Sequence, residues 1–475
     1  MISRISRTAS RWTFLGALIY APWAYGATTS TSIQITNCIL LAAFVLWAIE
    51  LLVSRRMPRF PRLLFFLVIA LVCVGGWMVF NAKSIYDSDF LVFVPLRNFA
   101  SFLAGSVDYT ISAEWIIRGA LLLGTILFVA DLSQSNRWLL RLWCAIALVG
   151  GSIAFLGLLQ KATGAQMIFW QPPPARLDLR ISTFFATYYY HGNAGAFLNL
   201  AWPLSAGLVI RTFSKRHHPA MRAVWISLLI VTIAGVLANT SRMAQLVAVV
   251  LLLAICLQFG PALVRKLSGM EKSVALAGAL AILLALVALA QATHLEQPLA
   301  RWQAESQRIP TDARWQAWHV ALAALPGTGL FGLGPGTFRV VFPSYNVASI
   351  NQVPGTWRFL HDDYLQTLIE WGWMGSALWG LLFFGAIAVG IRSCMKYARR
   401  EWTPRRRVLQ PVVIIALVGA ALHALVDFPF QIGSLQLYVA TYLGICWGST
   451  LWHPNESGRS NSILENRTSH GAESR

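Results

Sequence analysis

The residues best suited to chemistry stand in the string His361-Asp362-Asp363, which closes the one long polar stretch of an otherwise hydrophobic chain. That stretch runs from Gln291 to Leu360, and an apolar segment follows at once. Histidine is the side chain that takes up and releases a proton near neutral pH, so the string is a candidate catalytic site. From the residues alone, an alternative stays open: the two carboxylates cap the helix that follows.

The composition is that of a membrane protein with many spans. Of the 475 residues, 56% are hydrophobic and only 12% are charged, whereas soluble domains carry about 25% charged residues. The formal net charge is +19, and the basic residues lie in short segments between apolar runs. This pattern is typical of the cytoplasmic loops of a membrane protein, so we predict no nucleic-acid partner. The six cysteines have no paired spacing, which predicts neither structural disulfides nor a zinc site.

Apolar runs long enough to cross about 30 Å of hydrocarbon predict an all-α helical bundle of about twelve transmembrane helices. A large loop, residues 292–360, would separate the ninth span from the tenth. The break at Ser241 and Arg242 is very short, so the division of that stretch into two spans is the weakest of the set. The runs are 12–29, 33–53, 62–80, 112–131, 138–159, 185–210, 223–239, 243–260, 273–292, 370–391, 408–427 and 432–451.

Basic residues fall on alternate connections, which sets the orientation. They cluster before the first span and after every even-numbered span up to the tenth, at 4–11, 55–62, 137–141, 211–222, 265–272 and 392–407. By the positive-inside rule all six clusters are cytoplasmic, so both termini are predicted inside and the loop 292–360 outside. A cleaved signal peptide ending near Ala24-Tyr25-Gly26 remains the alternative for the first span.

Two features stand out inside the loop. Residues 311–325 space Trp315 and Trp318 as on one face of a helix lying at the membrane surface, with Thr311-Asp312 as its N-cap and Arg314 at its start.

The second feature is a glycine-rich segment beginning at Gly327, which matches G-x-G-x-x-G but follows a predicted helix rather than a strand. We therefore interpret it as a turn where backbone approaches a substrate or the membrane surface, not as a dinucleotide site.

The segment H361-D362-x9-G372-W373-M374-G375 resembles the signature of the O-antigen ligase and polymerase family, in which a His-Asn or His-Ser pair precedes nine residues and a G-x-x-G-like end. Four further segments resemble that family in the same order: 187–203, 240–246, 313–338 and 423–432. The resemblance covers roughly residues 180–450. Asp362 departs from the usual Asn or Ser, and Met243 from the expected Gly.

The resemblance implies an inverting glycosyltransferase that needs no metal or other cofactor. It would move a glycan from an undecaprenyl-diphosphate carrier to an acceptor hydroxyl outside the bacterial inner membrane. By this hypothesis His361 takes the acceptor proton, while Arg242 and Arg314 bind the diphosphate, because the guanidinium fork matches phosphate oxygens. A snorkelling cation is the alternative for Arg242, and a residue of the helix start for Arg314.

Further candidates to contact substrate are Asp362, Asn193, Asp427 and His423. His423 and Asp427, four apart on one predicted helix, either form an intramembrane pair at the site or brace the bundle. Asn193, with His191, either lines a groove for the lipid carrier or bonds another helix. Mg²⁺ at Asp362 and Asp363 is the alternative to a metal-free site.

The acceptor is left open between lipid A core, as in a ligase, and a carrier-linked glycan, as in a polymerase. A flippase or transporter is the rival from another class, but it predicts mid-bilayer polar groups in two symmetric halves, which are not apparent. Membrane lipids are expected partners of the basic cluster 399–407. We predict residues 1–180 to be N-terminal transmembrane helices, 181–452 to be the ligase-like region, and 453–475 to be a disordered cytoplasmic tail.

Overall fold

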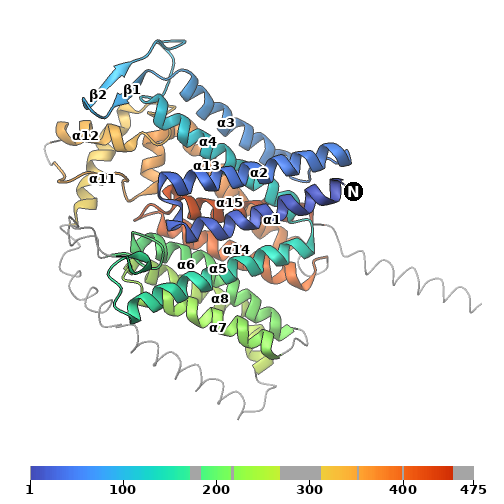
Figure 1. The fold of residues 1–475 in the computed structure, drawn as a ribbon. Helices are drawn as coiled ribbons and strands as arrows, with labels where there is room; N and C mark the ends of the chain where they lie inside the picture. The colour runs from blue at the N-terminus through green and yellow to red at the C-terminus, as the bar shows by residue number, and fades with distance from the viewer. Residues whose placement is uncertain are drawn as a thin grey trace, which may run out of the picture.

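The computed structural model describes residues 2–171, 183–214, 219–267, 312–349, 352–397 and 401–452, and these are mostly helical. Long helices run side by side through the molecule (Figure 1). Their bounds are α1 (Ile2–Trp23), α2 (Ser30–Ser54), α3 (Arg62–Phe80), α4 (Tyr109–Leu132), α5 (Asn136–Ala162), α6 (His191–Ser214), α7 (Pro219–Ala238), α8 (Arg242–Leu267), α13 (Asp363–Tyr397), α14 (Pro404–His423) and α15 (Gly433–Gly448).

Short elements gather at one end of the bundle, which we call the loop end. There α11 (Ala313–Ala324) and α12 (Phe338–Ala348) lie near a hairpin of β1 (Ser84–Asp87) and β2 (Val92–Pro95), as Figure 1 shows. The two strands pair antiparallel with Ser84 opposite Pro95. Single 3-10 turns are η1 (Tyr25–Ala27), η2 (Ile168–Trp170), η5 (Leu325–Gly327), η6 (Pro429–Gln431) and η7 (Ser449–Leu451).

The described part of the chain contains 9 helices long and apolar enough to cross a membrane: α2 to α8, α13 and α14. Two further predicted spans correspond to α1 and α15, which are not among these nine helices. α1 begins with basic residues, and α15 has only 16 residues. The predicted ninth span, 273–292, lies outside the described residues, as do residues 292–311 of the predicted loop and the tail 453–475. The short break before Arg242 is confirmed, because α7 ends at Ala238.

Two predicted helix boundaries are wrong, and both errors fall beside the site. The predicted span 185–210 begins as an irregular segment, with a bridge between Phe185 and Tyr188, and becomes helical only at His191. The predicted span 408–427 ends at His423. Asp427 therefore lies in a loop and not on the helix of His423.

Small residues let α6 sit close to its neighbours in the middle of the bundle. A side chain at Gly195 would collide with Ala244 of α8, and one at Gly150 of α5 would collide with Ala201 of α6. Close backbone approach of this kind is how helices associate in lipid, where burial alone gives little driving force. The packing fixes the first turns of α6 and α8 against each other at the loop end.

Candidate functional site

Asp427 is the point where three distant segments meet. Its side chain is 5% exposed. Oδ1 accepts from Nδ1 of His361 at 3.1 Å and from the Phe428 amide at 3.1 Å, and Oδ2 accepts from the Tyr190 hydroxyl at 3.2 Å. Nε2 of His423 lies 3.7 Å from Oδ2. Burial raises the pKa of Asp427, but His361 and His423 lower that pKa by more, so it lies well below its usual value and the carboxylate stays ionised.

His361 is held in the orientation that a general base requires. An ionised carboxylate only accepts hydrogen bonds, so Nδ1 of His361 is the nitrogen that donates to Asp427. The ring packs edge-on against Phe428, with centroids 4.6 Å apart, and against Trp357 at 5.9 Å. The side chain is 22% exposed.

The backbone at His361 is itself unusual. Its φ of 59° lies in the left-handed region, which residues other than glycine seldom adopt. The amide of Asp363, two residues on, donates to the carbonyl of Ala424 at 3.0 Å, so the turn is tied to the loop that carries Asp427. Strained backbone held by its surroundings in this way is common at functional sites.

Tyr190 links Arg314 to the carboxylate. Nη2 of Arg314 donates to the Tyr190 hydroxyl at 3.2 Å, and Nη1 donates to the carbonyl of Val426 at 3.2 Å. Burial lowers the pKa of Arg314, while the charges of Tyr190 and Asp427 raise it, with a net rise. Arg314 is thus a fixed cation beside His361. Tyr190 was not among the predicted site residues; its one local signal is its place in the run Tyr188-Tyr189-Tyr190-His191.

The predicted helix that begins near Arg314 is confirmed as α11. Asp312 caps α11, its Oδ1 accepting from the Arg314 amide at 2.9 Å. Trp318 donates from Nε1 to the carbonyl of Leu360 at 3.1 Å, which ties the helix to the residue before His361. Trp315 is 45% exposed. The helix therefore carries Arg314 and also contacts the residue before His361.

The two carboxylates after His361, those of Asp362 and Asp363, accept hydrogen bonds from different parts of the structure. Oδ1 of Asp362 accepts from the amides of Tyr364 and Leu365, each at 3.0 Å, which makes Asp362 the N-cap of α13. Asn and Ser are also good N-caps, so the departure from the family pattern at Asp362 preserves this bond. Asp363 is buried and accepts from the Phe430 amide at 2.7 Å, which ties α13 to η6.

Arg242 and Asn193 lie at the same end of the bundle. Arg242 begins α8, directly after the Asn239–Ser241 turn, and Nδ2 of Asn239 donates to the carbonyl of His191 at 2.9 Å. The next residue, Gly192, abuts Asp427 so closely that a side chain there would collide with Oδ2. The first turn of α6 therefore separates the start of α8 from Asp427. Asn193 is buried in that turn.

The glycine-rich segment packs against protein backbone. α13 is broken at Gly372, where φ is 61° and ψ is −170°, and a side chain there would collide with the amide of Gly332. The amide of Met374 donates to the carbonyl of Leu330 at 3.0 Å, and that of Leu333 to Ile369 at 2.9 Å. These glycines allow two chain segments to touch at the break in α13, just beyond the site.

Within the described ranges, no group of three or more His, Cys, Asp or Glu side chains is placed to share a metal ion. The predicted site residues instead fall into two sets. His361, Asp427, His423 and Arg314 form one connected cluster. Asp362 acts as a helix cap, Arg242 begins α8, and Asn193 is buried in the first turn of α6.

The described helices form a bundle long and apolar enough to span a membrane, with a buried His–Asp pair and an arginine at one end. A model of the family described as O-Antigen ligase matches residues 226–380, which is 155 of the 475 residues. This match supports membership of that family and, with it, a membrane enzyme of surface polysaccharide biosynthesis. The matched range includes Arg242, Arg314 and His361, while Tyr190 and Asp427 lie outside it. No curated protein matches the chain.

Proposed function

We propose that the protein transfers a glycan from an undecaprenyl-diphosphate carrier to an acceptor hydroxyl at the loop end, on the periplasmic side of the inner membrane. The observation that carries this proposal is the hydrogen bond from Nδ1 of His361 to buried Asp427, at 3.1 Å. It leaves Nε2 free to take a proton from a hydroxyl, which is the step that such a transfer needs.

The transfer is a single displacement. The acceptor oxygen gives its proton to Nε2 of His361 and bonds to the anomeric carbon. The bond from that carbon to the diphosphate oxygen breaks, and its electron pair leaves with the diphosphate. Attack from the face opposite the leaving group inverts the anomeric configuration. Asp427 stabilises the imidazolium that forms on His361, as a carboxylate does beside a catalytic histidine.

Charge builds on the diphosphate as it leaves, and Arg314 and Arg242 are the cations proposed to receive it. Only two N–H groups of the Arg314 guanidinium are used by Tyr190 and Val426, so others remain for phosphate oxygens. Arg242 comes from a separate hairpin at the same end. The proposed chemistry routes no step through a metal ion.

The test is transfer by the purified full-length protein and its variants in lipid nanodiscs. His361→Ala is expected to abolish transfer from an undecaprenyl-diphosphate glycan, and Arg314→Ala and Arg242→Ala to slow it at least about a hundredfold, as for the loss of a group that stabilises transition-state charge. His319→Ala is the matched control, because that histidine is exposed on α11. Normal surface glycan in cells carrying only His361→Ala contradicts the proposal.

A further inference from the structure

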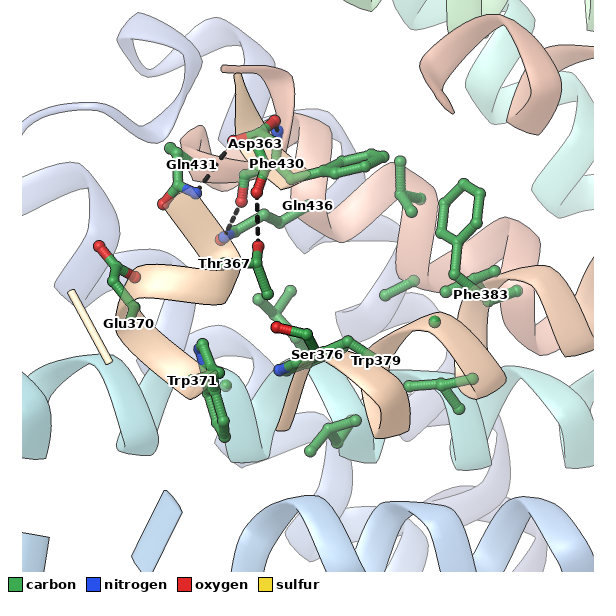
Figure 2. A pocket seen from close by; sticks show the side chains of 18 of the residues that line it. Asp363, Thr367, Glu370, Trp371, Ser376, Trp379, Phe383, Phe430, Gln431 and Gln436 are labelled. Atoms are coloured by element: carbon green, nitrogen blue, oxygen red, sulfur yellow. Dashed lines mark hydrogen bonds between the residues drawn. The ribbon is translucent and has the colours of Figure 1, made fainter. Parts of the chain in front are cut away.

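A cavity of about 370 Å³ lies between α4, α13, α15 and η6, and Asp363 is among its lining residues. Along α13 its lining residues run from Asp363, past the break at Gly372, to Phe384. Figure 2 shows polar side chains, among them Asp363, Gln431 and Gln436, gathered at one end, with Trp379 and Phe383 further along. The cavity is therefore a long apolar slot with a polar mouth.

The mouth lies close to the site. Gln431 donates from Nε2 to Oδ1 of Asp363 at 3.0 Å, and Asp363 is two residues from His361. At the far end, Phe384 lines the cavity and is 50% exposed, so the slot reaches the surface of a membrane-spanning helix. A molecule in the slot would join the site to the surrounding lipid.

A buried cation faces the mouth without a carboxylate partner among the described residues. Arg118 of α4 is 9% exposed, donates from Nη2 to the carbonyl of Gln431 at 3.1 Å, and lies over the Trp115 ring at 5.0 Å. Its charge interacts with that of Arg358, which repels it. A buried cation beside another cation calls for an anion.

The two carboxylates that line the cavity are already engaged. Asp363 accepts from Gln431 and from the Phe430 amide, and Glu370 accepts from the Gly336 amide at 2.9 Å and from other donors. Neither pairs with Arg118. The cavity thus combines a cationic mouth with an apolar slot, which matches an amphiphile with one anionic head and one long hydrocarbon chain.

We infer that the slot holds the polyprenyl chain of the carrier lipid, with Arg118 at the phosphate bonded to that chain. This inference rests on the proposed function and moves the carrier from the α6 side, where Asn193 was expected to line its groove, to the α4–α13 side. Arg314 and Arg242 remain assigned to the phosphate nearest the sugar. Because a chain in lipid gains little by burial alone, fit and charge decide the binding.

The test measures binding of undecaprenyl phosphate to the full-length protein in phosphatidylcholine nanodiscs. Gly380 lines the deep part of the slot, and a side chain there would meet no atom within 4 Å. Gly380→Leu is expected to bind undecaprenyl phosphate about tenfold more weakly, because the added side chain takes up space in the slot that the polyprenyl chain would fill. Geranyl phosphate, too short to reach Gly380, binds unchanged. Gly76→Leu on α3 is the matched control, with equally open space outside the slot.

A second variant tests the charge. Arg118→Gln is expected to weaken undecaprenyl phosphate several-fold and to leave undecaprenol unaffected. Wild-type affinity for undecaprenyl phosphate in both Gly380→Leu and Arg118→Gln overturns the inference. So does full displacement of undecaprenyl phosphate by equimolar phosphatidylglycerol, which would assign the slot to membrane phospholipid. Binding does not require transfer, so an intact slot in a protein without transfer activity would refute the proposed function alone.

Discussion

Asp427→Asn separates the charge of Asp427 from its geometry. The Phe428 amide donates to Oδ1 at 3.1 Å, and a backbone donor cannot reverse its direction. The amide side chain of the variant must therefore keep its oxygen at the Oδ1 position and turn its nitrogen toward the Tyr190 hydroxyl. Because His361 also bonds to Oδ1, at 3.1 Å, its proton stays on Nδ1 and Nε2 remains the base.

The variant thus loses only the negative charge that stabilises the imidazolium. A hydrogen bond to a charged partner contributes about 1.5–3 kcal/mol, so we expect kcat to fall by about 10- to 150-fold. That is less than the roughly 10⁴-fold loss seen where an Asp→Asn change beside a catalytic histidine also traps the wrong tautomer.

The assay is single-turnover transfer from an undecaprenyl-diphosphate glycan, with thermal stability in detergent as the control for folding. Wild-type kcat in Asp427→Asn would show that the carboxylate does not assist His361. A folded variant as inactive as His361→Ala would refute the orientation argued for its amide.

Three further predictions follow from the same contacts. Tyr190→Phe removes the hydroxyl between Arg314 and Asp427, so single-turnover transfer should slow about tenfold. An unchanged rate would show that this hydroxyl does not contribute to transfer. Asp362→Ala should lower the free energy of unfolding by about 1 kcal/mol while Asp362→Asn keeps it, because only the first loses the α13 cap; equal melting temperatures would contradict this. The pKa of Asp427 is lowered on folding, so its contribution to stability is present above about pH 4 and is lost as the pH falls. The melting temperature of the wild type should therefore drop more steeply between about pH 5 and pH 3 than that of Asp427→Asn, and parallel curves would refute the assignment.

The parts of the site that sequence patterns predicted are local ones. Asp312 as the cap of α11 and the short turn before Arg242 follow from neighbouring residues, and both are confirmed. His361 stands out by its residue type and by its place after the polar loop. Each of these signals lies within a few positions of the residue concerned, where helix capping and hydropathy act.

The connections between these parts depend on the fold. Tyr190 and Asp427 are 237 residues apart in sequence, and no local pattern pairs them. The predicted helix through Asp427 was wrong for a related reason: α14 ends at His423, and the loop that follows brings Asp427 to His361. Asp362 shows a different difficulty. A helix cap and a substrate contact can both be acidic residues, so the residue type alone did not distinguish the two roles.

The most direct test of the central claim is the anomeric configuration of the product formed by the purified protein from a defined undecaprenyl-diphosphate glycan and an acceptor glycan. A single displacement by a hydroxyl that His361 deprotonates predicts a new linkage inverted relative to the donor, with one undecaprenyl diphosphate released per linkage and no product from His361→Ala. Retained configuration, or product formation by His361→Ala at the wild-type rate, would contradict the mechanism.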